Sequence, residues 1–175
     1  MRGEIDLYYG DETQISEEGC IPYGWQCKDE NIAIESAKGI HISCFGILAR
    51  DNRLIYKTSV ETINSDFVIE QLDYFSFTIK KHTVIVLDNA SIHQSRKMKK
   101  MQEIWAKRNL FIFFLPPYSP HLNIIERLWK ELKTRWICPE NYKEGQSLFY
   151  AVTLILNEVG RRLKINFKPM NFNLT

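Results

Sequence analysis

Hydrophobic and polar positions divide the first half of the chain into strand-like segments followed by one helix-like segment. Residues 5–13 are rich in aromatic and β-branched side chains and predict a strand. Two more strands are expected at 39–49 and 53–60, on either side of Asp51-Asn52, where an Asn tolerates the left-handed backbone of a hairpin turn. Between 65 and 80 apolar residues recur at helical spacing and predict an amphipathic helix.

In the second half, short apolar runs alternate with longer periodic segments. The run at 84–87 and the run at 110–115 are continuous, as expected of strands that are buried on both faces. Helices are expected at about 94–108, 123–136 and 146–164, the last with a single apolar stripe. That stripe consists of Leu148, Val152, Ile155, Val159 and Leu163. Between the first two predicted strands, the Pro and Gly of 19–30 indicate a turn.

An antiparallel meander followed by alternating strands and helices predicts an α/β fold, in which helices flank a mixed five-stranded sheet. This order of elements matches an RNase H-like arrangement. At 175 residues we expect a single domain, 1–175. Apolar runs of about six residues are too short to span a membrane, and no signal peptide opens the chain. The four cysteines form no C-x-x-C pair and indicate free thiols in a reducing compartment. We therefore expect a soluble, intracellular protein.

Three acidic residues carry the candidate chemistry, because they lie in three separate predicted elements. Asp11 and Asp88 each close a strand-like segment, and Glu126 lies in the first turn of a predicted helix. Carboxylates that converge from separate elements are hard oxygen ligands and suit Mg²⁺ or Mn²⁺. Two such ions can activate a water and stabilise the leaving oxygen of a phosphodiester. The pattern predicts a metal-dependent nuclease or strand-transfer enzyme.

Each acid also has a structural explanation that the residues alone leave open. Asp88 is typical of a turn residue whose side chain accepts backbone N–H bonds. Glu126 fits a capping box with Asn123, or a helical ion pair with Lys130. Asp11 is also explained as a carboxylate at a strand end that faces water. It is followed by Glu12, and alternation along a strand sends these two side chains to opposite faces, so only one of them can face the site.

Contacts with nucleic acid would have to be local, because the net charge of the chain is only +2. The segment SRKMKK at 95–100 supplies Arg96, Lys97, Lys99 and Lys100 as candidate phosphate contacts, although a solvated helix face is the alternative interpretation. Asn89 and His93 flank the second acid. His93 is a candidate to contact a phosphate or to help position a nucleophile, and a structural histidine is the alternative.

Three segments, GDET, VIVLDNASIH and LPPYSPHLNIIERLWKELK, resemble the catalytic blocks of DDE transposases, in particular the mariner-like and bacterial insertion-sequence group. The resemblance covers roughly residues 5–136. It implies that Asp11, Asp88 and Glu126 are a catalytic triad that binds two Mg²⁺ or Mn²⁺ ions. It also implies cleavage of DNA at transposon ends and transfer of the 3′-hydroxyl into target DNA. The expected partner is DNA, bound by a homodimer, with no organic cofactor and no membrane, in the nucleoid-associated cytoplasm of a prokaryote.

Two features depart from the family pattern. His121 stands where the family usually has an acid, and Ile124 where it has a proline. Such transposases also carry helix-turn-helix modules ahead of the catalytic domain, and we expect this chain to lack them, because its first catalytic strand begins close to Met1. Alternatives are another RNase H-like nuclease that cuts without joining, or a non-catalytic remnant that binds DNA or dimerises.

Overall fold

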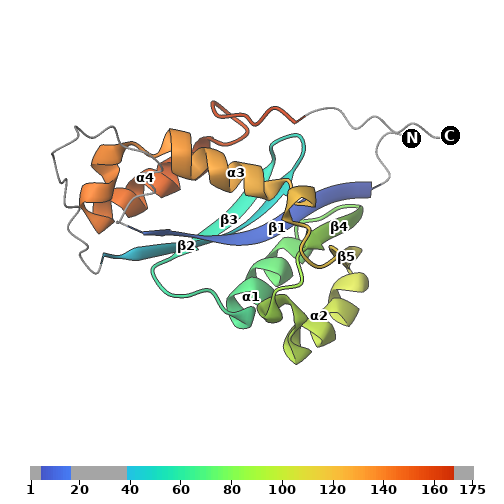
Figure 1. Ribbon diagram of the computed structural model, residues 1–175. Helices are drawn as coiled ribbons and strands as arrows, with labels where there is room; N and C mark the ends of the chain where they lie inside the picture. The colour runs from blue at the N-terminus through green and yellow to red at the C-terminus, as the bar shows by residue number, and fades with distance from the viewer. Residues whose placement is uncertain (1–4, 17–38, 168–175) are drawn as a thin grey trace.

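A computed structural model describes residues 5–16 and 39–167, which form a five-stranded sheet with helices on both faces (Figure 1). The strand order is β3-β2-β1-β4-β5. β1 to β3 form an antiparallel meander, whereas β4 and β5 run parallel to β1. The strands are β1 (Ile5–Ser16), β2 (His41–Ala49), β3 (Leu54–Ser59), β4 (His82–Leu87) and β5 (Leu110–Phe114). The predicted mixed sheet is confirmed. The turn predicted at 19–30 lies outside the described residues.

The hairpin between β2 and β3 turns at Asn52, whose φ of 68° is the left-handed conformation expected from the sequence. The side chain of Asn52 also has a distant partner. It donates to the carbonyl oxygen of Ile165 (3.2 Å) and accepts from the Ile165 backbone N–H (2.7 Å). The hairpin therefore holds the chain that follows the last helix.

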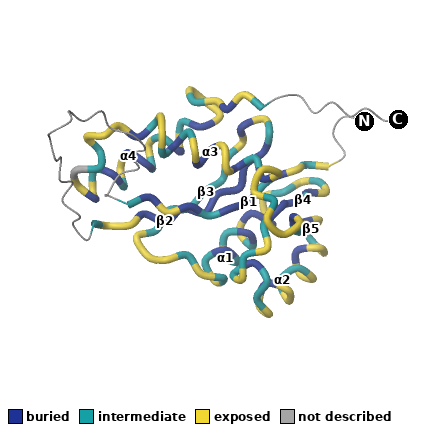
Figure 2. The backbone as a smooth tube through the Cα atoms, viewed as in Figure 1, coloured by how far each residue is buried: buried dark blue, intermediate teal, exposed yellow. Residues whose placement is uncertain are grey.

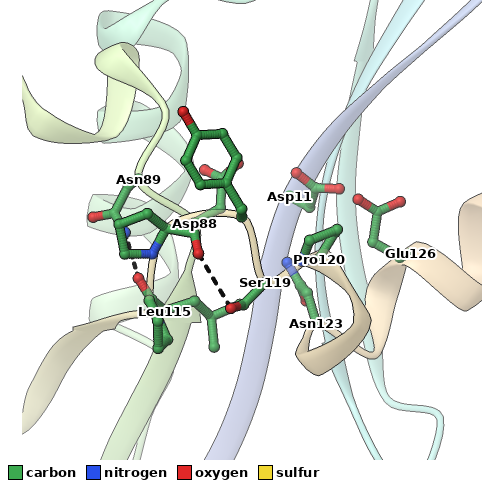
Figure 3. Close-up of a pocket in the computed structure, with 11 residues that line it drawn as sticks. Asp11, Asp88, Asn89, Leu115, Ser119, Pro120, Asn123 and Glu126 are labelled. Carbon is green, nitrogen blue, oxygen red and sulfur yellow. Dashed lines mark hydrogen bonds between the residues drawn. The ribbon is translucent and has the colours of Figure 1, made fainter.

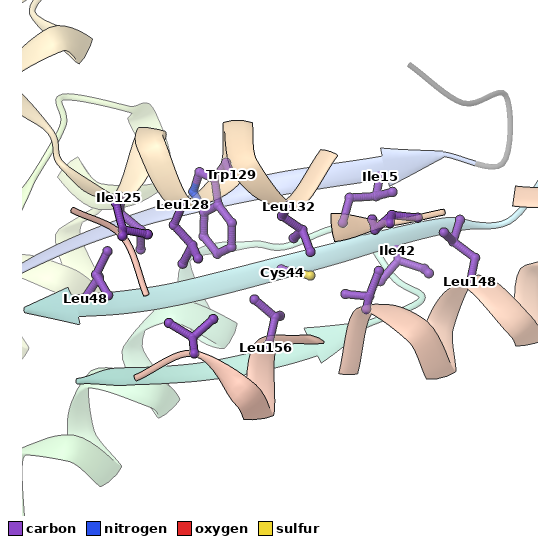
Figure 4. Close-up of a cluster of buried hydrophobic side chains, with 14 residues drawn as sticks. Ile15, Ile42, Cys44, Leu48, Ile125, Leu128, Trp129, Leu132, Leu148 and Leu156 are labelled. Carbon is purple, nitrogen blue, oxygen red and sulfur yellow. The ribbon is translucent and has the colours of Figure 1, made fainter. Parts of the chain in front are cut away.

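One face of the sheet is covered by α3 (Ile125–Glu131), a π-helical turn (Leu132–Trp136) and α4 (Gly145–Glu158) (Figure 4). Every second residue of β2 packs on this face, as strand alternation requires. The apolar side of α3 and of the turn after it is buried on this face, through Ile125, Leu128, Trp129 and Leu132. This cluster also includes Ile15, Ile42, Cys44, Leu48, Leu148, Val152 and Leu156.

The opposite face is covered by α1 (Ser65–Ser76) and α2 (Arg96–Ala106) (Figure 1). A short 3₁₀ turn (Ser91–Gln94) leads from β4 into α2. The apolar side of α2 packs inward through Met98 and Trp105, while the basic side chains lie outside, as predicted. The buried backbone of the central strands lies between the two helical layers in Figure 2.

Three predicted element boundaries or burials are wrong, each for a tertiary reason. α4 ends at Glu158 rather than near 164, because Gly160 has a φ of 82° and lies against the Asn52 carbonyl, where a Cβ would be 2.5 Å away. β5 is an edge strand with an uncovered face, so Phe111 and Phe113 are exposed rather than buried. The helix predicted at 123–136 is interrupted by the π-helical turn. No helix in the described ranges is long and apolar enough to cross a membrane.

Candidate active site

Asp11 lies inside β1 rather than at its end, because the strand continues to Ser16. β1 and β4 pair in parallel with Tyr9 opposite Val86, so this register continues to bring Asp11 level with Asp88. Asp88 follows the last residue of β4, as the sequence predicts. The two acids therefore come from adjacent central strands, at the edge where β4 ends and β1 continues alone.

Glu126 lies in the first turn of α3 and is exposed. The capping box predicted with Asn123 is not formed: the residue before the helix is Ile124, Asn123 Oδ1 accepts instead from the Ile125 backbone N–H (3.4 Å), and the Glu126 N–H donates to the Asn123 carbonyl oxygen. Within the described residues the Glu126 carboxylate makes no hydrogen bond or ion pair, so the alternative pair with Lys130 is also not formed. Neither structural explanation accounts for this glutamate.

The three carboxylates line one cleft of about 470 Å³ (Figure 3). Asp11 comes from β1, Asp88 from the end of β4 and Glu126 from the start of α3. The segment after β5 closes the other wall, through Leu115, Pro116, Pro117, Tyr118, Ser119 and Pro120. The fold thus gathers the three sequence-predicted acids around one solvent-accessible hollow.

The carboxylate of Asp11 is 8% exposed and belongs to the α3 side of the sheet. Its Oδ2 accepts a hydrogen bond from Trp129 Nε1 at 3.2 Å. Burial raises the pKa of Asp11 to about 8, and the negative charges of Glu12, Glu126 and Asp88 act in the same direction. Burial and the surrounding acids therefore favour the protonated form of Asp11 at neutral pH.

The approach of α3 to Asp11 depends on a glycine in the neighbouring strand. Gly46 of β2 is paired with Asp11. A Cβ at this position would lie 2.9 Å from Cη2 of Trp129 and 3.1 Å from Cδ1 of Ile125. Only a residue without a side chain lets Trp129 cross the strand closely enough to reach the carboxylate.

The surroundings of Asp88 favour its charged form, in contrast to those of Asp11. Its Oδ1 accepts from the backbone N–H of Ala90 (2.9 Å) and lies 2.8 Å from Nδ1 of His93. The hydrogen bond with His93 lowers the pKa of Asp88, against the effect of partial burial. The turn interaction predicted as an alternative is therefore present, and it coexists with a position in the cleft.

Glu12 points away from the cleft, as alternation predicts, and reaches His93 on the α1/α2 side. Its Oε2 is 3.1 Å from Nε2 of His93, outside good hydrogen-bonding alignment. Burial by itself would lower the pKa of His93, but its contacts with Asp88 and Glu12 raise it to about 9. The imidazolium is therefore the form held between the two carboxylates.

The donor set of the cleft fits a divalent cation of the Mg²⁺ or Mn²⁺ type, since it consists of carboxylate oxygens and no thiolate. Asp11 supplies the physical indication, because a buried carboxylate beside three other acids is relieved by a cation. In residues 5–16 and 39–167, no three Asp, Glu, His or Cys side chains are already drawn together around one point.

The remaining sequence-predicted residues separate into two groups. Asn89 lines the cleft and donates from its side-chain amide to the Leu115 carbonyl, whereas His93 is fully buried beneath Asp88. The four basic candidates of α2 lie on the helix layer opposite α3 and do not line the cleft. Of these four, Lys97 pairs with Asp66 at 2.8 Å.

Several residues of the cleft were not assigned a role in it from sequence. Asn123 is buried and donates to the carbonyl oxygen of Gly10 (3.1 Å), which ties the start of α3 to the strand residue next to Asp11. Tyr118 is fully exposed at the rim, with a φ of 57°. The proline-rich segment that contains both positions was the available signal, but its orientation depends on the tertiary fold.

A second hollow of about 700 Å³ runs along the outer side of α3 and shares Pro120, Asn123 and Glu126 with the first. Its charged lining is mostly basic. Arg127 and Lys130 are exposed and form no ion pair within the described part of the chain, whereas Arg135 pairs with Glu131. The other lining residues are Arg50, His121, Ile124, Thr134 and Phe167.

Residues 6–148 match the family described as DDE superfamily endonuclease. This match covers more than half of the chain, so the chain belongs to that family. Over 63 residues it is also 33% identical to the uncharacterized protein y4pE/y4sA of Sinorhizobium fredii (strain NBRC 101917 / NGR234), a stretch that covers 36% of this chain and 42% of that protein.

Solved structures share the fold at low sequence identity. The Mos1 transposase paired-end complex with the left transposon end has a TM-score of 0.59 and 15% identity, covering 87% of this chain and 53% of that one. The catalytic core domain of BIV integrase has a TM-score of 0.57 and 12% identity, covering 92% and 86%. The fold is therefore that of transposase and integrase catalytic cores, and the chain spans about half the length of the Mos1 chain.

Proposed function

We propose that this chain is the catalytic domain of a DDE-type transposase. It cuts DNA phosphodiesters at transposon ends and transfers the freed 3′-hydroxyl into target DNA. The observation that carries the proposal is the single cleft lined by Asp11, Asp88 and Glu126, in a member of the DDE superfamily endonuclease family. Among the similar structures are a Mos1 strand transfer complex and a Mos1 paired-end complex with Mn, which supports a divalent metal and DNA as substrate.

In this proposal Asp11, Asp88 and Glu126 hold two Mg²⁺ or Mn²⁺ ions. The bound ions supply charge for activating a water or a 3′-hydroxyl and for stabilising the leaving oxygen. Asp88 is already ionised and held by His93 and Ala90. Asp11 would lose its proton on binding a cation, because the positive charge would offset the repulsion from the neighbouring acids. Glu126 can turn toward the cleft freely, because no described residue holds its carboxylate.

The DNA backbone would follow the second hollow into the cleft. Arg127 and Lys130 lie on the same helix as Glu126, and the two hollows share that glutamate. Cationic side chains there would contact phosphates and position the duplex without reading its sequence. The α2 cations Arg96, Lys99 and Lys100 would contact a more distant part of the DNA or of a second strand. A homodimer on DNA, as proposed from the resemblance, would place two such chains on two transposon ends.

The test uses the full chain with Mg²⁺ or Mn²⁺ and supercoiled plasmid, scored for nicking. A short duplex with a free 3′-hydroxyl is added to score joining. Asp11→Asn, Asp88→Asn and Glu126→Gln should each reduce nicking at least roughly 10³-fold, equivalent to about 4 kcal/mol of transition-state stabilisation. Glu103→Gln is the matched control, because Glu103 is an exposed carboxylate of α2 outside the cleft.

The outcomes separate the candidate functions. Nicking and joining that both depend on the three acids support the transposase. Nicking without joining would identify a nuclease that only cuts. Binding of DNA without either reaction, with all three substitutions silent, would identify a non-catalytic remnant and end the proposal.

A further inference from the structure

The imidazole of His93 is completely buried and lies between two carboxylates from different strands. Nδ1 is 2.8 Å from Oδ1 of Asp88, and Nε2 is 3.1 Å from Oε2 of Glu12. Nε2 and that Glu12 oxygen are both buried and have no hydrogen-bond partner within the described residues, so their contact is an ion pair without hydrogen-bond geometry. The ring therefore has a hydrogen bond to Asp88 on one side and a carboxylate of Glu12 facing it on the other.

The arrangement depends on the alternation of β1. Asp11 faces α3 and the cleft, while Glu12 faces the opposite layer and reaches the back of the ring. The ring itself is set by the 3₁₀ turn, in which the His93 backbone N–H donates to the Ala90 carbonyl (2.9 Å), and it lies 6.5 Å from the ring of Phe45. A strand residue next to the first acid is thereby connected to the second acid through one side chain.

The connection leaves Asp88 with one committed oxygen and one free oxygen. Oδ1 receives both the Ala90 N–H and the His93 contact, whereas Oδ2 has no partner within the described residues. The side chain is half exposed and lines the cleft. With Oδ1 held on the protein side, rotation of the carboxylate is restricted and Oδ2 is the oxygen presented to the cleft.

We propose that Glu12 and His93 are positioning residues, which orient the Asp88 carboxylate to receive a divalent cation through Oδ2. This inference rests on the metal-binding role proposed above for Asp88. Groups that orient a metal-binding side chain typically contribute about 10–100-fold to metal affinity or activity. Both ring nitrogens of a buried imidazole need polar partners in any role. A positioning role is indicated because both partners are carboxylates and one of them, Asp88, lines the cleft.

The experiment measures Mn²⁺ affinity of the full chain by isothermal titration calorimetry, without DNA, and the melting temperature of each variant. His93→Leu keeps the volume and removes both polar contacts, so it should weaken Mn²⁺ binding roughly 10–100-fold. His93→Asn places an amide N–H where Nδ1 lies, so it should restore most of the affinity although it loses Glu12. Glu12→Gln should weaken binding in the same direction by a smaller factor.

Met98→Ala is the control for structure alone. Met98 is fully buried in the apolar cluster that includes Phe45, and it does not line the cleft. Truncating its side chain should therefore lower the melting temperature and leave Mn²⁺ affinity unchanged. The inference is overturned if His93→Leu binds Mn²⁺ as wild type does, or if Met98→Ala weakens binding equally. If His93→Leu fails to fold, the test rests on Glu12→Gln. Mn²⁺ affinity of Glu12→Gln equal to that of wild type would then overturn the inference.

Asp88→Asn separates this inference from the proposed function. If Asp88→Asn abolishes Mn²⁺ binding and His93→Leu does not weaken it, only the positioning role is lost and the metal site stands. If Asp88→Asn itself binds Mn²⁺ like wild type, the metal site proposed for this cleft is wrong, and the positioning role is lost with it.

Discussion

Asp11 and Asp88 are neighbours on adjacent parallel strands, yet their surroundings shift their pKa values in opposite directions. Asp11 is enclosed under α3, receives one N–H from Trp129, and has its pKa raised to about 8 by burial and by surrounding acids. Asp88 is half exposed at a strand end, and its pKa is lowered by His93 and a backbone N–H. Two carboxylates of one cleft therefore differ in protonation at neutral pH.

The difference follows from which side of the sheet supports each acid. The α3 side offers Asp11 an apolar helix and a single neutral donor, whereas the α1/α2 side offers Asp88 a protonated imidazole. The pKa of Asp11 is therefore raised and that of Asp88 is lowered within one cleft. Four predictions test this asymmetry.

The largest effect is expected from pH in metal-free protein. The folded chain keeps a proton on Asp11 up to about pH 8, whereas the unfolded chain releases it near 3.8. The free energy of unfolding should therefore fall as pH rises from about 4 to 8, on the order of 2–4 kcal/mol. His93 acts with the same sign, losing its stabilising contact between 6.5 and about 9.

Urea denaturation in EDTA across this pH range measures the effect, with Asp11→Asn as the comparison. The neutral amide can still accept from Trp129 but has no charge to repel, so Asp11→Asn should be more stable than wild type at pH 8 and should show a shallower pH slope. A slope identical to that of wild type would contradict the raised pKa of Asp11.

Asp88→Asn should change the free energy of unfolding in the opposite direction to Asp11→Asn. It removes the charge that faces a buried imidazolium, and we expect a loss of about 1–3 kcal/mol near pH 6. Because the pKa of Asp88 is lowered in the folded chain, its contribution is present above 3.8 and disappears as pH falls below that value. The difference in the free energy of unfolding between Asp88→Asn and wild type should therefore disappear at acidic pH. If Asp11→Asn and Asp88→Asn changed the free energy of unfolding in the same direction, the proposed asymmetry between the two acids would be wrong.

Gly46→Ala tests how closely the α3 side approaches Asp11. The added Cβ would lie 2.9 Å from Trp129, which should cost about 1–3 kcal/mol by overpacking. In Trp129→Phe the contacting ring atoms are absent, so the same glycine substitution should cost less. A double-mutant cycle by chemical denaturation measures this coupling, and additive losses would show that Trp129 does not determine the spacing.

The smallest effect is expected from the single hydrogen bond on the α3 side. Trp129→Phe removes the indole N–H from Asp11, worth about 0.5–1.5 kcal/mol. The bond is stronger to an ionised carboxylate, so the loss should be greater at pH 9 than at pH 6. Leu128→Ala, a packing change in the same helix, should show no such difference between the two pH values.

The order and type of the elements were predictable from the amino-acid sequence, because these depend on local periodicity. The hairpin at Asn52, the strand that ends before Asp88, and the buried stripe of α3 were all predictable from residues within one or two turns. Alternation was enough to predict that Asp11 and Glu12 face opposite sides of the sheet. The family resemblance indicated the three acids, although the local pattern left open a turn role for Asp88, a capping role for Glu126 and a water-facing strand end for Asp11.

Features that depend on partners distant in the chain could not be predicted from local pattern and follow from the folded arrangement. The register of β1 on β4 made Asp11 level with Asp88, and pairing with β2 carried β1 beyond Asp11 to Ser16. Burial of His93 between Asp88 and Glu12 required two strands and a 3₁₀ turn to meet. The same reason explains the exposed face of β5 and the early end of α4 at Gly160. Local preference sets a segment's conformation, whereas its surroundings set burial and pKa, since these arise from atoms that folding alone brings together.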